Sequence, residues 1–175
     1  MQSLIEKAAP IRLVIFDVDG VLTAGILSYG SSGIESKQFH VQDGQGIKHL
    51  KKSGVEIAII TTCQSDIVKR RMDDLGVSHL YQGQLNKLPA YNDLKQKLTL
   101  SDEQIAYVGD DLPDLPILNR VGFAITVANA PKIIKEHVHW VTKLKGGKGA
   151  AREVCDFIML AQGTYQKVID SYLER

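Results

Sequence analysis

The chain has few cysteines and no long apolar segment. Its 175 residues include two cysteines, Cys63 and Cys155, and their spacing fits neither a disulfide framework nor a metal site. No apolar run approaches the roughly 18 residues that a membrane span needs. The apolar run at residues 13–16 is too short for a signal peptide and stops at Asp17. We therefore expect a cytoplasmic protein with reduced thiols and no contact with membrane.

The chain also lacks an excess of charge of either sign. The formal net charge is +1, which gives no electrostatic reason to expect binding to nucleic acid. There are no internal repeats and no low-complexity segments. Hydrophobic residues make up 44% of the sequence, enough for a core, and the length suits one domain. We predict a single domain over residues 1–175.

Short apolar runs alternate with helical patterns along most of the chain. The predicted strands are residues 12–16, 56–60, 105–108, 123–127 and 139–142, with a short one near Leu80. Helices are expected over residues 46–53, 65–75 and 88–98, and helical spacing also runs from residue 150 to residue 173. Nearly continuous apolar strands that alternate with helices predict an α/β fold with a parallel sheet covered on both faces.

One segment, residues 24–42, interrupts this alternation and is predicted to be a β-hairpin. Its arms are residues 26–29 and 35–41, and its turn is Gly30-Ser31-Ser32-Gly33. An isolated two-stranded hairpin is only marginally stable in water. We therefore expect it to pack against something else, such as another subunit.

Acidic residues directly follow two of the predicted strands. Asp17 and Asp19 come after the first, in the stretch FDVDGVLT. Two neighbouring carboxylates repel each other unless a cation lies between them or one is protonated. Mg²⁺ prefers oxygen ligands and often shares them with a phosphate, and an aspartate can also act as a nucleophile. A simple turn after the strand is the structural alternative.

Further polar residues follow other predicted strands. Asp110, Asp111 and Asp114 come after residues 105–108, Thr61 comes after residues 56–60, and Lys87 precedes a predicted helix. Because sites in parallel sheets form beyond the carboxyl ends of the strands, the two acidic clusters are expected to converge on one cation. Each feature also has a plainer explanation: solvated acidic caps, a structural threonine and a surface lysine.

In this order, the motifs resemble those of the haloacid dehalogenase superfamily. The resemblance implies a Rossmann-like three-layer core, Mg²⁺ and phosphoryl transfer through an aspartyl-phosphate. It implies that Asp17 is the nucleophile and Asp19 the general acid and base. It further implies that Thr61 and Lys87 bind the phosphoryl group. The implied metal ligands are Asp17, the main-chain carbonyl of Asp19, and Asp110, with Asp111 and Asp114 as supporting residues.

Nearly the whole chain resembles, more narrowly, the 3-deoxy-D-manno-octulosonate 8-phosphate (KDO 8-phosphate) phosphatases. The resemblance rests on the hairpin and on the stretches FHVQDGQGIK, LYQGQ and GGKGAAREVCD. It implies a hairpin in place of a cap domain, and a homotetramer with active sites near subunit interfaces. It also implies that a C-terminal tail from about residue 146 helps close the site. The implied substrate residues are His40, Val41, Gln42, Asp43, Gly44, Lys48 and Arg71.

The sequence departs from this family where arginines are expected near the sugar acid, since Gln42 and Cys63 occupy those positions. Arginine can bind both oxygens of a carboxylate, whereas glutamine carries no charge and cysteine is a weak donor. Lys48 and Arg71 remain, either as substrate contacts or as surface charges. Three alternatives stay open: a phosphatase for a nine-carbon nonulosonate 9-phosphate, a phosphomutase, and a non-catalytic oligomeric scaffold.

Overall fold

The structure, a computed structural model, describes residues 2–28 and 36–174 and is built around a parallel sheet. In this part of the chain, six strands have the order β3-β2-β1-β4-β5-β6, and every neighbouring pair is parallel. The strands are β1 (Leu13–Phe16), β2 (Glu56–Ile60), β3 (His79–Tyr81), β4 (Ile105–Val108), β5 (Phe123–Thr126) and β6 (Trp140–Val141). The prediction of an α/β fold with a parallel sheet is confirmed.

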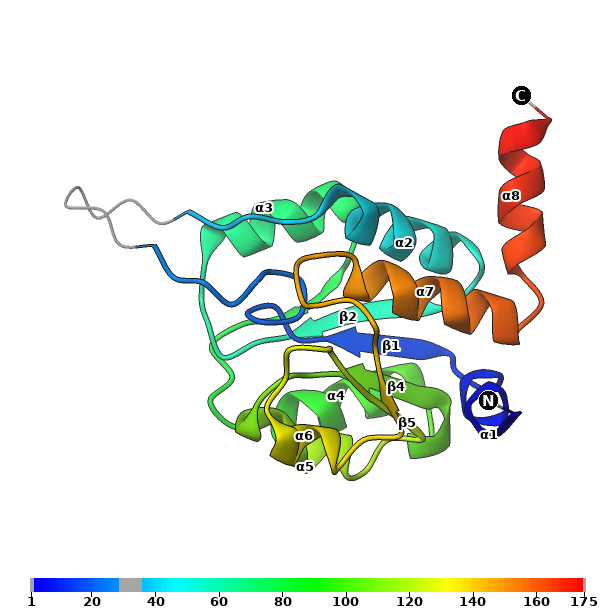
Figure 1. Ribbon diagram of the computed structural model, residues 1–175. Helices are drawn as coiled ribbons and strands as arrows, with labels where there is room; N and C mark the ends of the chain where they lie inside the picture. The colour runs from blue at the N-terminus through cyan, green and yellow to red at the C-terminus, as the bar shows by residue number, and fades with distance from the viewer. Residues whose placement is uncertain (1, 29–35, 175) are drawn as a thin grey trace.

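Helices cover both faces of this sheet and give a three-layer architecture (Figure 1). On one face lie α2 (Val41–Lys52), α3 (Asp66–Leu75) and α7 (Ala150–Ala161). On the other lie α4 (Leu88–Leu98), α5 (Leu115–Leu118) and α6 (Lys132–Lys135). The remaining helical segments are α1 (Gln2–Ala8), α8 (Tyr165–Leu173) and two 3₁₀ turns, η1 (Asp102–Gln104) and η2 (Leu112–Asp114).

Burial on both faces explains the apolar runs. Every residue of β1, β4 and β5 is buried. The register aligns the ends of the central strands, because Phe16 of β1 pairs with Ile59 of β2 and with Val108 of β4. The chain leaves β1 toward β2 on one side and later returns to β4 on the other. The carboxyl end of β1 is therefore the switch point of the sheet, where ligands bind in open α/β folds.

Helix α2 begins at Val41, five residues before the predicted start. The glycines in its first turns weaken the helical pattern, but each makes room for a neighbouring helix. A side chain at Gly44 would collide with the guanidinium of Arg71, and a Cβ at Gly46 would lie 3.0 Å from Cα of Arg152. Close packing against α3 and α7 therefore outweighs the low helix propensity of glycine.

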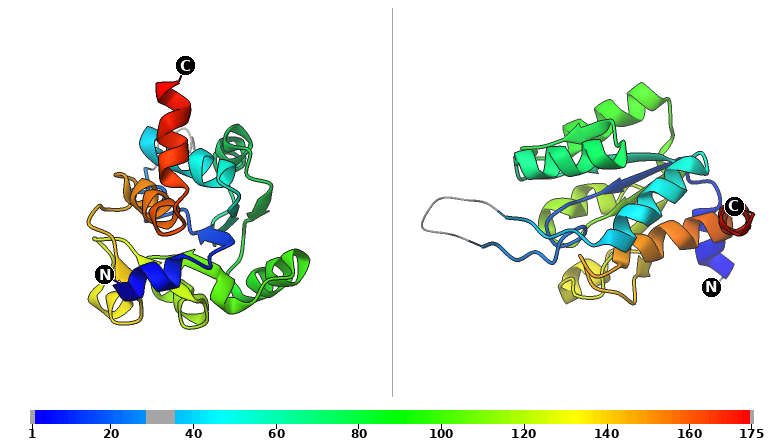
Figure 2. Two further views of the ribbon diagram at one scale, coloured as in Figure 1. Left: turned by 90° about the vertical axis from the view of Figure 1, so that its right-hand side faces the viewer. Right: turned by 90° about the horizontal axis from the view of Figure 1, so that it is seen from above.

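The helical pattern of residues 150–173 forms two helices and not one. Gly163 adopts a φ of +68° between α7 and α8, a conformation that ends a helix and favours glycine. Helix α7 buries six of its residues, whereas α8 buries none. Figure 2 shows α8 projecting from the body of the protein. Helix α1 was not predicted.

The predicted hairpin is only partly described. Residues 24–28 and 36–40 project from the carboxyl-end side of the sheet (Figure 1), and neither stretch is a β-strand. The second arm ends at His40, because Val41 begins α2. The predicted turn, Gly30–Gly33, lies outside the described residues. Among the helices that the structure describes, none is long and apolar enough to cross a membrane.

Candidate active site

Asp17 lies at the end of β1 and is almost completely buried, with 6% of its surface exposed. Its main-chain N–H donates to the carbonyl of Val108, 2.9 Å away, which continues the pairing with β4 by one residue. The carboxylate is therefore held at the point where the two central strands diverge. Such a buried charge is costly without a partner.

Lys87, which immediately precedes α4, supplies that partner. Its side chain is 3% exposed, and its Nζ lies 2.8 Å from Oδ1 of Asp17 and 2.6 Å from Oδ1 of Asp114. The hydroxyl of Tyr107 lies 3.3 Å from the same nitrogen. The ammonium thus joins β1 to the segment that follows β4. The two carboxylates raise the pKa of Lys87 against the opposing effect of burial, so the lysine stays charged.

Both oxygens of Asp114 are occupied by donors. Oδ1 accepts from Lys87 and from the hydroxyl of Tyr107, at 2.6 Å in both cases. Oδ2 accepts from the main-chain N–H groups of Asp110 and Asp111, at 2.9 and 3.1 Å. Asp114 therefore organises the loop after β4. Gly109 is required there, because a Cβ at this position would overlap the Asp114 side chain.

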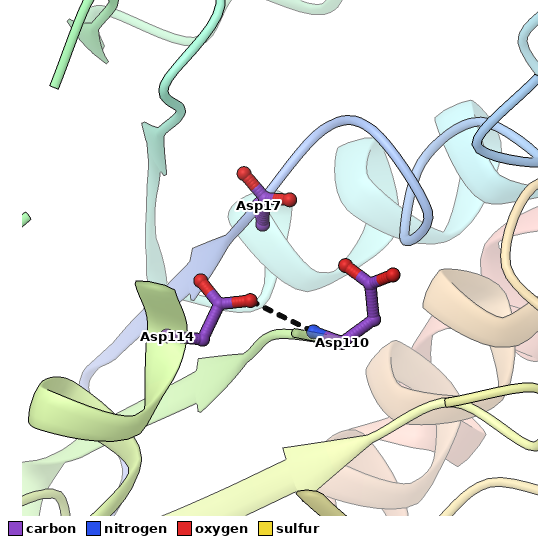
Figure 3. A group of neighbouring side chains, drawn as sticks. All are labelled: Asp17, Asp110 and Asp114. Carbon is purple, nitrogen blue, oxygen red and sulfur yellow. Dashed lines mark hydrogen bonds between the residues drawn. The ribbon is translucent and has the colours of Figure 1, made fainter. Parts of the chain in front are cut away.

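One carboxylate oxygen from each of Asp17, Asp110 and Asp114 lies within 4.8 Å of the other two, and Figure 3 shows how these side chains are arranged. Because Asp114 already accepts four hydrogen bonds, Asp17 and Asp110 are the members of this cluster suited to hold a cation. A small, hard cation such as Mg²⁺ fits a site of carboxylate oxygens that also opens to a phosphate. Gly20 leaves the necessary room, since a Cβ there would overlap the carboxylate of Asp110.

The pKa values of two carboxyls reflect this crowding. Burial raises the pKa of Asp17 to about 6; Lys87 opposes the rise and Asp114 adds to it. Burial, followed by the charges of Asp17 and Asp114, raises the pKa of Asp110 to about 7. Because burial is the largest cause of both shifts and neighbouring carboxylates add to it, the site disfavours ionised carboxyls. A divalent cation between Asp17 and Asp110 would favour their ionised forms.

Asp19, two residues after the nucleophile candidate, lies in the turn that follows β1. Its Oδ1 accepts from Nζ of Lys37 at 2.7 Å and from the hydroxyl of Thr23 at 3.4 Å. The side chain of Lys37 is only 5% exposed, whereas that of Asp19 is 31% exposed. Asp19 is thus open on one side and held by a buried cation on the other.

The acidic residues and Lys87 line one cavity of about 420 Å³. The described residues that line it are Asp17, Asp19, Gly25, Leu27, Thr62, Cys63, Lys87, Asp110, Asp111, Pro113 and Asp114. The structure therefore brings together the two predicted acidic clusters and Lys87. Cys63, at one of the positions where the family has arginine, also faces this cavity.

Thr61 lies at the end of β2 but is not among the described residues that line the cavity. Its side chain is buried, and its hydroxyl accepts from the main-chain N–H of Cys63 at 3.3 Å. Thr62 lines the cavity instead. The phosphate-binding role of Thr61 stays a prediction.

The seven predicted substrate residues lie apart from the cavity in this protomer. His40, Asp43, Gly44 and Arg71 line a second, much smaller hollow beside α2 and α3. Val41, Gln42 and Lys48 are exposed along α2. All seven remain predicted substrate contacts.

Asp43 has a structural role that was not foreseen. Its carboxylate accepts from the main-chain N–H groups of Arg152 at 2.8 Å and Gly149 at 3.3 Å. It therefore caps the amino end of α7 from the neighbouring helix α2.

The segment before α7 packs directly on the turn after β1. The main-chain N–H of Gly147 donates to the carbonyl of Val21 at 2.9 Å. A Cβ at Gly146 would overlap the carbonyl of Gly20. The glycine-rich stretch thus lies backbone against backbone on the loop that carries Asp19.

Two functional candidates, Lys37 and Tyr107, were not identified from the sequence. A lysine in a polar hairpin arm gives no signal of burial. The tyrosine in the predicted strand 105–108 does give a signal of function, because the hydroxyl of a tyrosine buried in a strand covered on both faces needs a hydrogen-bond partner.

Comparison with known proteins identifies the family of the chain. A family model described as haloacid dehalogenase-like hydrolase matches residues 66–154. The 3-deoxy-D-manno-octulosonate 8-phosphate phosphatase of Escherichia coli strain K12 is 49% identical over 160 residues, which cover 91% of this chain and 85% of that protein.

Solved structures agree closely with the fold. A 3-deoxy-D-manno-octulosonate 8-phosphate phosphatase from Yersinia pestis has a TM-score of 0.93 and 46% identity, covering 94% of this chain and 89% of that chain. The corresponding phosphatase from Moraxella catarrhalis, in complex with a magnesium ion, a phosphate ion and KDO, has a TM-score of 0.96 and 43% identity. That match covers 98% of this chain and 99% of the other.

The parallel sheet and the Asp17–Lys87–Asp110 site define the class, and the chain belongs to the haloacid dehalogenase-like hydrolases. Within this class it belongs to the family of 3-deoxy-D-manno-octulosonate 8-phosphate phosphatases.

Proposed function

We propose that the protein is a Mg²⁺-dependent phosphomonoesterase that hydrolyses KDO 8-phosphate to KDO and phosphate. The observation that carries the proposal is the buried contact between Lys87 and Asp17, beside Asp110, on a cavity open to a substrate. Relatives that share almost half of its residues bear the name of this activity. The cation, held by Asp17, Asp110 and the main chain of Asp19, would neutralise charge on the transferring phosphoryl group.

In the first half of the reaction, Asp17 attacks phosphorus. Lys87 holds Oδ1 of Asp17, which leaves Oδ2 as the attacking oxygen. A bond forms between this oxygen and phosphorus while the bond from phosphorus to the sugar oxygen breaks. Asp19 gives a proton to the departing alcohol.

In the second half, Asp19 takes a proton from water, and the water oxygen attacks phosphorus. Phosphate leaves and Asp17 is restored as a carboxylate. Lys87 stabilises the negative charge throughout, together with the side chain of Thr61 or Thr62. One aspartate thus supplies the nucleophile and another the proton, as in other sites where two carboxyls have different environments.

We further propose a cytoplasmic homotetramer in which each 175-residue chain forms one domain. One continuous core includes residues from Ala8 to Met159, which supports a single domain. At the base of the projecting arms, Ile26 and Leu27 are 76% and 63% exposed, an apolar surface suited to a second copy. In such an assembly, Arg71, Lys48 and the His40–Gly44 stretch would contact the sugar acid at an interface.

A substrate panel tests the proposal. Phosphate release with Mg²⁺ would be measured for KDO 8-phosphate, a nine-carbon nonulosonate 9-phosphate and an aryl phosphate. We expect KDO 8-phosphate to be preferred and Asp17→Asn to be inactive, because an amide cannot attack phosphorus. Asp74→Asn, on the exposed side of α3, serves as the matched control and should keep full activity.

The other outcomes separate the reaction from the substrate. Preference for the nine-carbon ester would show that Gln42 and Cys63 mark a different sugar. Appearance of an isomer without free phosphate would indicate a phosphomutase. Equal release by wild type and Asp17→Asn would refute the mechanism.

A further inference from the structure

We propose that Lys37 is a positioning residue that holds the carboxylate of Asp19 in the orientation needed for proton transfer. The inference rests on the proposed function, in which Asp19 is the general acid and base. It adds a residue from the projecting arm, 18 positions along the chain, to the machinery of the reaction.

The contact between Lys37 and Asp19 is short and shielded. Nζ of Lys37 lies 2.7 Å from Oδ1 of Asp19, and the lysine side chain is 5% exposed. Lysine is among the residues least often buried, and burying its charge is costly unless a partner compensates. On an arm that projects from the protein, a lysine side chain could extend into solvent at little cost. The location of Nζ against Asp19 therefore indicates a specific contact and not an incidental surface pair.

The contact also fixes which oxygen of Asp19 can transfer a proton. Lys37 donates to Oδ1 at 2.7 Å, and the Thr23 hydroxyl, whose one proton is shared with the carbonyl of Val18, lies 3.4 Å from the same oxygen, so Oδ1 serves as an acceptor. Oδ2 is then the oxygen that carries the proton to the departing sugar oxygen and later accepts one from water. The short hydrogen bond from Lys37 also restricts rotation of the carboxyl group. Catalysis of this kind depends on such restriction, because small errors in position cost large factors in rate.

The place of Lys37 in the chain connects this orientation to substrate recognition. Phe39 comes two residues after Lys37, and its ring centre lies 5.6 Å from the guanidinium carbon of Arg71. The next residue, His40, lines the same small hollow as Arg71. One short stretch therefore contacts the acid–base residue at one end and the predicted sugar-binding residues at the other.

Two substrates with different leaving groups isolate this role. The sugar alcohol of KDO 8-phosphate needs a proton as it leaves, whereas the nitrophenolate of 4-nitrophenyl phosphate leaves without one. Water must be deprotonated in the second step with either substrate. Loss of orientation at Asp19 should therefore slow both steps for the sugar phosphate and only the second step for the aryl phosphate.

The experiment compares Lys37→Met, Lys37→Arg and a matched control, Lys69→Met, with the wild type. Lys69 is exposed on α3. For Lys37→Met we expect kcat on KDO 8-phosphate to fall about 100-fold with KM changed less than about threefold. With 4-nitrophenyl phosphate, rapid mixing should show a fast first turnover followed by a slow steady rate. Lys37→Arg, which keeps the charge, should recover most of the loss, and Lys69→Met should match the wild type.

A double variant shows whether Lys37 acts through Asp19. We expect Lys37→Met in the Asp19→Asn background to be no slower than Asp19→Asn alone, because coupled residues are not additive.

Three results would overturn the inference. Lys37→Met could be as active as Lys69→Met, or it could slow the first turnover of 4-nitrophenyl phosphate as much as the steady rate. The effects of Lys37→Met and Asp19→Asn could also be fully additive in the double variant. Equal phosphate release by wild type and Asp17→Asn would instead overturn the proposed function and the inference with it.

Discussion

At the scale of single residues, Lys87 is the group on which the site depends most. It is buried between two carboxylates on different segments, Asp17 at the end of β1 and Asp114 after β4. A buried ion pair contributes little net stability compared with apolar residues, but removal of one partner leaves an uncompensated charge. Lys87 therefore supports the fold as well as its proposed role in binding phosphate.

We expect Lys87→Met to lower the free energy of unfolding by about 3–5 kcal/mol in metal-free buffer. The matched control is Lys97→Met, which removes a pair of the same kind between exposed side chains, 2.8 Å from Asp93. That change should cost much less stability, because solvent screens an exposed ion pair. Urea unfolding measures the free energy of unfolding of both variants. A similar loss of stability in Lys87→Met and Lys97→Met would contradict the importance of the buried lysine.

The raised pKa values of Asp17 and Asp110 predict how stability depends on pH. Both carboxyls bind a proton more tightly in the folded protein, with pKa values of about 6 and about 7, than in the unfolded chain. The stability of the metal-free protein should therefore fall as pH rises from about 4 through these values. The raised pKa of Lys87 affects the stability of the folded protein only at far higher pH.

Thermal unfolding at about pH 5 and about pH 8, with and without Mg²⁺, tests this dependence. Mg²⁺ should raise the unfolding temperature more at the higher pH, because it binds ionised carboxylates. Asp110→Asn removes one of the two titrating groups and should reduce the difference. A metal-free protein that is more stable at the higher pH, with Asp110→Asn unchanged, would contradict the assignment.

At the scale of elements, α2 and α7 make the most extensive contact of any helix pair in the described part of the chain. The glycines of α2 allow the approach, and Asp43 of α2 caps α7. Burial raises the pKa of Asp43, while the N–H groups of Arg152 and Gly149 lower it in part. The capping carboxylate thus links two helices that are far apart in sequence.

Asp43→Ala should lower the free energy of unfolding by about 1–2 kcal/mol, as expected for loss of a helix cap. Asp74→Ala, on the exposed surface of α3, should change it by less than about 0.5 kcal/mol. Denaturant unfolding and the KM for KDO 8-phosphate would be measured together. A large rise in KM without loss of stability would favour the substrate role predicted from the sequence.

The elements differ in how far the sequence could predict them. The central strands were located to within one residue, because burial on both faces leaves a plain apolar run in β1, β4 and β5. The start of α2 depends on contacts with α3 and α7, which no local pattern encodes. The break after α7 instead falls at Gly163, a local signal that the continuing helical spacing hid. The acidic residues were predictable because they follow the strand ends, and Lys87 was predictable from its place before a helix together with the family resemblance. The contact of Lys37 with Asp19 was not, since it joins an irregular arm to a turn.

At the scale of the whole molecule, the exposed base of the arms predicts self-association. We expect the wild type to sediment as a tetramer and Ile26→Asp as a smaller species, because a charge there would be buried at the interface. Ile133→Asp on α6 is the matched control, since Ile133 is also exposed, and should remain tetrameric. A monomeric wild type, or dissociation of the control alone, would contradict this arrangement.

The contact of Gly146 and Gly147 with the turn after β1 has a consequence for the order in which the protein matures. During synthesis, amino-terminal segments leave the ribosome first and begin to fold before the rest is made. The proposed nucleophile Asp17, Lys87 and the acidic loop after β4 are all complete by Asp114, yet the turn that carries Asp19 receives its supporting backbone only with residues 146–147. A nascent chain would therefore hold every proposed reacting group well before Asp19 has this backbone support, and activity should appear only late in translation.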